Sequence, residues 1–483
     1  MMVKPKSDES AREGEPLSVS SLPRHGPILL SLAPLAYLVF VVARYAVDVP
    51  YWDEWELAPI LQKSYMGQLT FGDLWAQHNE HRLFIPQLVM LGLARLTGWN
   101  IRYELEMNVF LGIGILGVLL WQMRATARRL EISNWTWAAP VCSLVVFSMS
   151  QFQNWLWGWQ IQMMMNALAV VGGVVLLSNP EFSWRKFAAA AALGVVAAFS
   201  FANGLLFWPV GLGVLWLGAR GKPERTPALA AWVGIGVLVV TAYFWHYQKP
   251  ADHPPLALAL QHPMAFGYYV FIYIGGICAQ YFQWSFSSTL LLALGCGLAA
   301  IGVLGWSIHR LLRFRIATVE ILLPYLGLSA YSLAGAVVTG FGRVGFGPSQ
   351  ALSSRYCTMM TPFWVSLTFL LFLLARGRPQ PPRSDADSSP GTPARGKSAI
   401  AAAWLLAGAI GLLGCGSFFA IEGARQTSEV QSRGRTRLLE LAEHPETANE
   451  DRGLSSLYPK PEVVLERYPF LLREHLSVFA EFR

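Results

Sequence analysis

A long series of apolar segments, each of a length that can cross a membrane, constrains this chain more than any other feature. A transmembrane helix needs about 20 mostly apolar residues. For two of the apolar stretches, 83–97 and 264–282, it is ambiguous whether they cross the membrane. The first of them is short and contains Pro86 and Arg95. The clear segments are 27–46, 104–123, 135–151, 161–178, 187–201, 204–219, 228–247, 288–308, 318–339, 357–375 and 399–420. The sequence therefore predicts an all-α polytopic membrane protein with about 11–13 transmembrane helices.

The scarcity of charge supports the same conclusion. Only 14% of the 483 residues are charged, whereas a soluble domain carries about 25%. A chain of this length could not cover a water-exposed surface with so few charges, so a large soluble enzyme is excluded. Five scattered cysteines, mostly inside apolar segments, also exclude a disulfide scaffold.

The distribution of lysine and arginine predicts the orientation. With 83–97 and 264–282 kept on one side of the membrane, one set of loops carries 16 Lys and Arg in 59 residues, and the opposite set carries 7 in 125 residues. Positive charge in short loops marks the cytoplasmic side. This pattern predicts a cytoplasmic N-terminus and an outer C-terminus. The net charge of +7 follows mainly from this rule, so it does not imply nucleic-acid binding.

These expectations divide the chain into three parts. Residues 1–26 are predicted to be a disordered cytoplasmic tail, and residues 27–420 a transmembrane domain. This domain includes a large outer loop at 47–103, with interfacial helices around 57–66 and 83–97, and a Pro/Ser-rich cytoplasmic linker at 376–398. Residues 421–483 are predicted to be an outer, periplasmic tail with amphipathic helices, one of which could dock back on the protein.

The first outer loop contains the most unusual polar residues. Asp53 and Glu54 lie side by side within VPYWDEWE (49–56), directly after the first segment, and a carboxylate there could take a proton from an acceptor hydroxyl as a catalytic base. His78, Glu80, His81 and Arg82 follow in HNEHR as candidate substrate-binding residues. Asp53, His78 and His81 are also candidate ligands for a divalent cation. The alternative is an interfacial loop with tryptophan anchors and solvated charges.

Two other predicted outer segments contain candidate binding residues. QFQNWLWGWQ (151–160) contains three tryptophans, with Asn154 and Gln160 able to hydrogen-bond a sugar; the alternative is an aromatic belt at the membrane interface. The Gly-rich TGFGRVGFGPSQALSSRYCT (339–358) contains Arg343, Arg355 and Tyr356, and arginines beside a Gly-rich backbone suit a phosphate. The alternative for this segment is a flexible hairpin whose arginines extend toward the interface.

In this organisation the chain resembles the GT-C type of membrane glycosyltransferase, which uses polyprenyl-phosphate-linked sugars. The resemblance rests on a first span that leads into a large outer loop with an acidic pair, on the 339–356 loop containing SSRY, and on the REHLSVF sequence near the C-terminus. It implies an inverting sugar transfer in the cell envelope of a bacterium. Asp53 matches the position of the family's base. In this family basic residues on outer loops hold the donor phosphate, for which Arg343 and Arg355 are the candidates, while HNEHR matches no general family motif.

The predicted function is therefore transfer of a hexosyl or pentosyl group from a polyprenyl phosphate to a lipid-linked or polysaccharide acceptor, on the outer face of the inner membrane. Expected partners are these two substrates and membrane lipid, and the cofactor would be a divalent cation if one is needed. A transporter or flippase of lipid-linked sugars is an alternative, but it would place ionisable groups at the membrane midplane. A non-catalytic subunit of polysaccharide assembly is a third interpretation.

Overall fold

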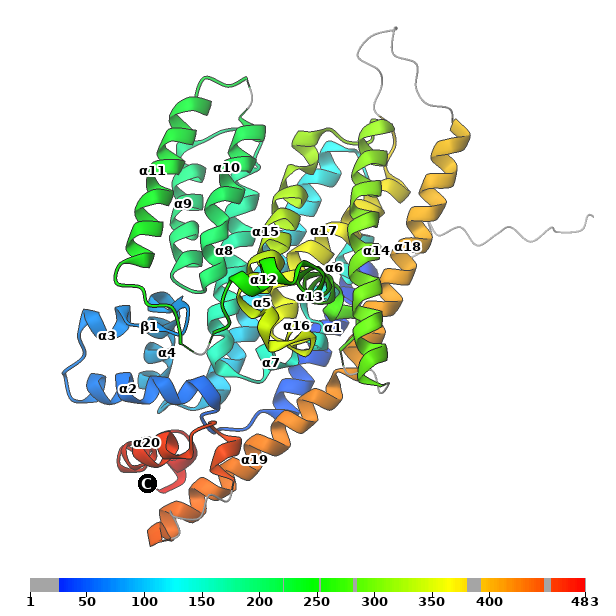
Figure 1. Ribbon diagram of the computed structural model, residues 1–483. Coiled ribbons are helices and arrows are strands. Elements are labelled where there is room, and N and C mark those ends of the chain that lie inside the picture. Colours follow the sequence, from blue (N-terminus) through cyan, green and yellow to red (C-terminus); the bar gives the residue numbers. More distant parts are fainter. Residues whose placement is uncertain are drawn as a thin grey trace, which may run out of the picture.

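The computed structural model describes residues 26–219, 221–251, 253–280, 285–379, 392–446 and 453–482. The predicted N-terminal tail and most of the Pro/Ser-rich linker lie outside these residues. Helices make up most of the described chain, whose only sheet is a two-stranded hairpin. The all-α fold class is confirmed (Figure 1).

Eight helices of the described chain are long and apolar enough to cross a membrane. The other expected spans at 135–151, 187–201 and 204–219 correspond to shorter helices. The eight contain α1 (Gly26–Tyr45), α5 (Ile101–Arg129), α8 (Ile161–Leu177), α11 (Arg225–Phe244), α14 (Phe286–Arg313), α15 (Val319–Arg343), α17 (Tyr356–Arg376) and α18 (Thr392–Phe419), which leads into α19 (Ile421–Glu443). The shorter apolar helices include α6 (Ala138–Val146), α9 (Trp184–Ala198), α10 (Phe207–Gly218) and α13 (Pro263–Gly275).

Helix α17 forms the centre of the bundle. Its sequence is apolar on every face, which is typical of a helix surrounded by other helices, and its most apolar stretch is completely buried. Three of its hydroxyl groups donate to backbone carbonyls of the same helix: Thr361 Oγ1 donates to Cys357 O at 3.2 Å, Ser366 Oγ to Pro362 O at 2.7 Å, and Thr368 Oγ1 to Trp364 O at 2.9 Å. The helix therefore buries its polar groups without leaving them unpaired.

A polar layer lies below the bundle in Figure 1 and contains the first outer loop. The elements of this loop are the 3-10 helix η2 (Trp52–Glu56), the helices α2 (Leu57–Tyr65), α3 (Phe71–Trp75) and α4 (Phe84–Thr97), and the strands β1 (Gln77–His78) and β2 (His81–Arg82). Short elements connect the helices, namely η3 (Trp135–Trp137), η4 (Met149–Gln151), α7 (Phe152–Trp155), η5 (Gly158–Gln160), η6 (Ala202–Leu206), α12 (Ala257–Gln261), η7 (Gly276–Cys278), η8 (Val344–Phe346) and α16 (Pro348–Ala351).

The C-terminal segment packs against this outer loop. It comprises η10 (Leu454–Ser456), α20 (Pro461–Arg473) and η11 (Ser477–Phe482). Arg467 forms an ion pair with Glu56 at 3.0 Å, and Tyr458 donates a hydrogen bond to the same carboxylate at 2.7 Å. The backbone amide of Trp52 donates to Leu457 O at 2.6 Å. The C-terminal residues thus hold η2, the element that contains Asp53.

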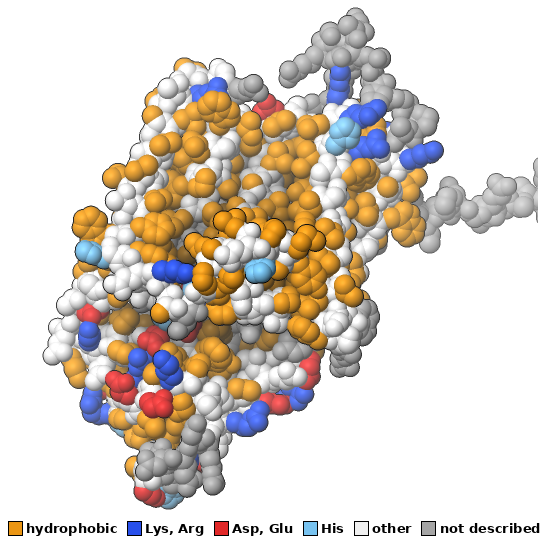
Figure 2. Space-filling model, in the orientation of Figure 1, with side chains coloured by type: hydrophobic (Ala, Val, Ile, Leu, Met, Phe, Trp, Pro, Cys, Tyr) orange, Lys and Arg blue, Asp and Glu red, His pale blue; other side chains and the backbone are white. Residues whose placement is uncertain are grey.

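The surface separates by chemistry in the same direction. Figure 2 shows apolar side chains over the upper part of the molecule, lysine and arginine side chains gathered at its upper end, and both signs of charge in the lower layer. A recess lies beneath α12 and α13, where the apolar and charged parts meet (Figures 1 and 2). The segments predicted to face outward thus lie together around the lower end of the helix bundle.

Candidate functional site

The acidic pair is divided by the fold of η2. The backbone amide of Tyr51 donates to Glu54 Oε2 at 2.7 Å, which closes the turn, and Trp52 adopts a left-handed φ of 51°. Glu54 is consequently directed inward and is only 1% exposed, whereas the Asp53 side chain keeps 25% of its surface. Of the two expected catalytic carboxylates, only Asp53 therefore keeps an exposed side chain.

The HNEHR segment forms a tight hairpin rather than an irregular loop. His78 of β1 pairs with His81 of β2, and the two-residue turn between them has Asn79 at a left-handed φ of 49°. Opposed residues of an antiparallel pair project to the same face. The hairpin is fixed to the loop after α11, because Gln77 Nε2 donates to Gln248 O at 2.6 Å and Gln248 N donates to Gln77 Oε1 at 3.0 Å.

The two parts of the first outer loop meet at Asp53 and His78. His78 Nε2 lies 3.8 Å from Asp53 Oδ2, and the His78 ring packs edge-on against Trp159 with ring centres 5.2 Å apart. Both side chains retain some exposure, 17% for His78 and 25% for Asp53. An imidazole at this distance can orient the carboxylate or exchange a proton with it after a small movement.

Glu80, at the tip of the hairpin, is surrounded by basic side chains. It forms a close ion pair with Arg343 at the end of α15, and its oxygens lie 3.6 Å from His81 Nε2 and 3.5 Å from His253 Nε2. Burial alone would raise the pKa of the Glu80 carboxyl, but the charges of His81 and Arg343 outweigh it and hold the pKa at about 2. Glu80 thus joins the first outer loop to the end of α15.

His81 shows that these groups form one electrostatic cluster. Burial lowers its pKa to about 4; the charges of His78 and Arg343 also lower it, and those of Glu80 and Asp53 oppose this effect. Its ring stacks on Phe201 at 4.3 Å, and its Nδ1 accepts a hydrogen bond from Ala202 N at 3.2 Å. At neutral pH His81 is therefore an uncharged imidazole, and its pKa is affected by Asp53 and His78 as well as by Glu80 and Arg343.

Arg82 has a different environment from the one expected of a substrate ligand. It is 4% exposed, and its guanidinium donates to three backbone carbonyls, including Trp75 O at 2.7 Å. The other two acceptors are Tyr243 O and Trp245 O, at the end of α11. These bonds satisfy carbonyls that the helix itself leaves unpaired. The structure thus uses Arg82 to connect the hairpin to α11.

The tryptophan-rich segment is buried rather than exposed at an interface. Trp155, Trp157 and Trp159 are at most 5% exposed, so they neither form a membrane belt nor present a face to a sugar. Gln160 is also buried, at 2%, and its side-chain oxygen accepts no hydrogen bond from the described residues. The segment instead supports η2: Trp157 Nε1 donates to Tyr51 O at 2.9 Å, and Trp159 N to Glu54 Oε1 at 3.2 Å.

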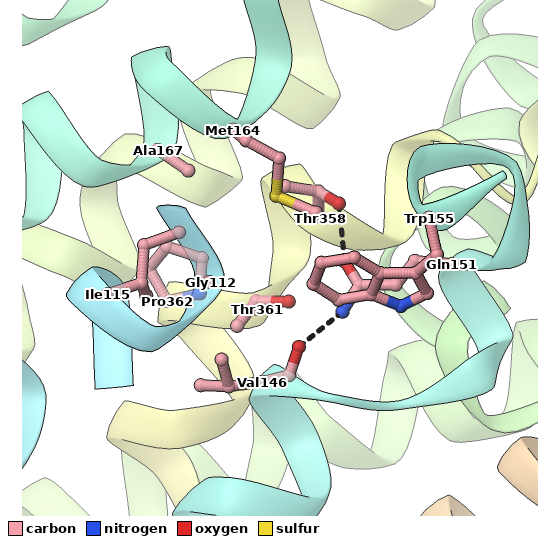
Figure 3. A pocket seen from close by; sticks show the side chains of 10 residues that line it. All are labelled: Gly112, Ile115, Val146, Gln151, Trp155, Met164, Ala167, Thr358, Thr361 and Pro362. Atoms are coloured by element: carbon pink, nitrogen blue, oxygen red, sulfur yellow. Dashed lines mark hydrogen bonds between the residues drawn. The ribbon is translucent and has the colours of Figure 1, made fainter. Parts of the chain in front are cut away.

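The helices beneath this segment are closely packed. The void among them has a volume of about 10 Å³, roughly the space of one water molecule, and Figure 3 shows the side chains that line it. There Gln151 donates to Val146 O at 2.5 Å and accepts from the Thr358 hydroxyl. The void is too small for a sugar, so the polar residues around it belong to the packing of the protein.

Arg355 and Tyr356 lie at the start of α17, beside the same segment. The amide of Arg355 donates to Gln153 Oε1 at 3.3 Å, and its carbonyl accepts from Asn154 Nδ2 at 2.9 Å. Its guanidinium lies 5.7 Å from the ring of Tyr356 and forms no hydrogen bond or ion pair with the described residues. The Tyr356 ring stacks on Tyr273 at 4.8 Å.

No three His, Cys, Asp or Glu side chains of the described chain are grouped as a metal site would require. The three candidate cation ligands divide between two contacts: Asp53 with His78, and His81 with Glu80. Sequence reasoning missed His253 as a neighbour of Glu80, and it missed Glu104 and Gly158 beneath Glu54. The only signal for Glu104 was that it is a charge near the end of an apolar segment.

No family model and no curated protein matches the chain. Among solved structures, the fold is similar to the crystal structure of ArnT from Cupriavidus metallidurans bound to undecaprenyl phosphate. The alignment covers 87% of this chain and 81% of that chain, with 14% sequence identity and a TM-score of 0.47.

Proposed function

We propose that this protein is a membrane glycosyltransferase that moves a sugar from a polyprenyl phosphate to a lipid-linked or polysaccharide acceptor. The carrying observation is that a partly exposed carboxylate, two histidines and an arginine, from segments far apart in the chain, gather at one end of an apolar helix bundle. A reaction between a membrane-embedded donor and a polar acceptor needs such a border position. We place this end on the outer face of a bacterial inner membrane because of the loop charges.

In the proposed reaction, the acceptor hydroxyl oxygen attacks the anomeric carbon of the donor. The bond between that carbon and the phosphate oxygen breaks, and the polyprenyl phosphate leaves with the electron pair. Asp53 takes the proton of the hydroxyl, with His78 at 3.8 Å to orient its carboxylate. Direct displacement inverts the anomeric configuration.

The phosphate of the donor would be bound by arginine. Arg355 is the more available of the two candidates, because Arg343 is engaged by Glu80. Guanidinium groups match the geometry of phosphate oxygens. Arg343 would join Arg355 when the negative phosphate competes with Glu80 for it.

A sugar ring could stack on Trp52. This side chain adjoins Asp53 and is 41% exposed, and aromatic rings offer an apolar face with a defined geometry. The buried tryptophans of residues 151–160 would then contribute indirectly, by supporting the turn that contains Trp52 and Asp53.

The test is sugar transfer by the full-length protein in lipid nanodiscs, with a panel of polyprenyl phosphate sugars as donors and cell-envelope lipids as acceptors. We expect Asp53→Asn and Arg355→Ala each to slow the release of polyprenyl phosphate strongly. Asp73→Asn should retain it, because Asp73 lies on the same loop but is paired with Lys63 at the surface. Transfer at the wild-type rate by both Asp53→Asn and Arg355→Ala would refute the proposed site.

The same assay distinguishes the alternatives. If the wild-type protein moves labelled lipid-linked sugar across the bilayer without consuming it, the protein is a flippase. If it does neither, the enzyme assignment is refuted. Treatment with EDTA tests whether a divalent cation is needed, for which Asp53 and His78 are the candidate ligands.

A further inference from the structure

A second carboxyl group is buried beneath the candidate site, on the first turn of α5. Glu104 is 1% exposed, and its Oε1 accepts a hydrogen bond from Trp99 Nε1 at 3.1 Å. Its Oε2 is buried and has no hydrogen-bond partner among the described residues. An unpaired buried carboxyl oxygen costs free energy, so this atom requires an explanation.

Gly158 brings Glu104 next to Glu54. A Cβ atom on residue 158 would lie 2.2 Å from Glu104 Oε2 and 2.9 Å from Glu54 Oε1. The two oxygens therefore lie within 3 Å of one point, and only the lack of a side chain at this position leaves room for both. Glu54 Oε1 already accepts from Trp159 N, and Glu54 Oε2 accepts from Tyr51 N.

Two ionised carboxylates this close together and this deeply buried would repel each other strongly. Within the described part of the chain neither carboxylate is paired with a cation, and the other charged group that acts on Glu104 is Asp48, which is acidic as well. Asp48 has partners of its own. Its carboxylate accepts hydrogen bonds from Ile101 N and from the Ser477 hydroxyl, and the positive charges of Arg102 and Arg435 favour its ionised form.

We propose that Glu54 and Glu104 hold one proton between them beside Gly158, and that this acid pair positions Asp53. The hydrogen bonds indicate where the proton lies. Both oxygens of Glu54 accept from backbone amides, whereas Glu104 Oε2 has no donor. A protonated Glu104 Oε2 therefore donates to the Glu54 carboxylate, which leaves neither group unpaired. Burial, followed by the charge of Glu104, raises the pKa of Glu54 well above its usual range, in agreement with a retained proton.

The consequence for Asp53 follows from the geometry of η2. Glu54 closes the turn through the Tyr51 amide and directs Asp53 to the opposite, partly exposed side. A second negative charge at Glu104 would push Glu54 away and open the turn. The role of Glu104 and Gly158 in positioning Asp53 rests on the proposed function, but the shared proton does not.

Infrared spectroscopy of the full-length protein in nanodiscs tests the shared proton directly. We expect the carbonyl band of a protonated carboxylic acid at pH 7, and we expect it to disappear in both Glu104→Gln and Glu54→Gln. Glu106→Gln, an exposed carboxylate two residues away on α5, is the matched control and should keep the band. Absence of the band from the wild-type protein, or its survival in both variants, would overturn the proposal.

Sugar transfer tests the positioning role. Glu104→Gln still offers an N–H donor to Glu54, so it should retain transfer within about threefold and remain active at alkaline pH, where the wild-type pair loses its proton. Glu104→Ala and Gly158→Ala should each lower kcat about 10- to 100-fold with little change in KM. An unchanged kcat in both variants would remove the positioning role. If no variant transfers sugar, the proposed function is refuted. The infrared measurement then still tests the shared proton independently.

Discussion

Arg82 offers a sharp test of how the site is held together. Its guanidinium donates to the carbonyls of Trp75, Tyr243 and Trp245 while being 4% exposed. Arg82→Ala leaves three carbonyls without their donor. A hydrogen bond to a charged group contributes about 1.5–3 kcal/mol. Because two of the bonds are only partly buried, water can replace some of this energy, and we expect a loss of about 3–5 kcal/mol in unfolding free energy.

The assay is reversible unfolding in mixed micelles, in which SDS is titrated into a mild detergent and tryptophan fluorescence is recorded. The matched control is Arg355→Ala. Its guanidinium forms no hydrogen bond with the described residues and contacts the Tyr356 ring, an interaction worth about 0.5–1 kcal/mol. Arg82→Lys should recover little stability, because one ammonium cannot reach three carbonyls. An Arg82→Ala protein of wild-type stability that fails to bind polyprenyl phosphate would refute this reasoning and make Arg82 a ligand.

Three further predictions follow from the same contacts. His81 has a folded pKa of about 4, below its unfolded value, so its contribution to stability is present above about pH 6.5 and is lost as the pH falls toward 4. In a series of unfolding titrations, His81→Asn should therefore flatten the pH dependence in this range by about one proton, and an unchanged slope would contradict the assignment. Arg467→Ala removes the ion pair with Glu56 and the bond to Trp55 O, and limited proteolysis should then cleave within residues 453–482 faster than in Arg473→Ala, whose partner Glu474 is its own neighbour. Trp52→Ala should raise the KM for the donor about tenfold if the ring stacks on the sugar, whereas Trp52→Phe should raise it less; equal values for the two variants would exclude stacking.

Apolar length was sufficient to predict most of the long helices. The predicted span 27–46 corresponds to Gly26–Tyr45, and 161–178 corresponds to Ile161–Leu177. The segment 135–151 was less predictable, because its apolar residues are divided among η3, α6 and η4. Composition indicates that a segment is buried, but it does not indicate whether the segment is one straight helix.

The sequence predicted which segments contribute to the candidate site, but not which way their side chains point. Asp53 and Glu54 are adjacent in sequence, and only the tight turn of η2 separates them into a partly exposed and a buried carboxylate. The sequence suggested Arg82 as a substrate ligand because it does not reveal the real acceptors. Two of these are backbone carbonyls of residues about 160 positions away. Contacts of this kind depend on three-dimensional packing, and no local pattern in the sequence records them.

In the proposed mechanism, Asp53 is the base of a sugar transfer at the outer end of the helix bundle. The most direct measurement compares wild-type protein with Asp53→Asn in nanodiscs, following the release of polyprenyl phosphate from a polyprenyl phosphate sugar. The proposed mechanism predicts that Asp53→Asn binds the donor with wild-type affinity but releases polyprenyl phosphate about 100- to 10,000-fold more slowly. Release at the wild-type rate by the folded variant would contradict the claim.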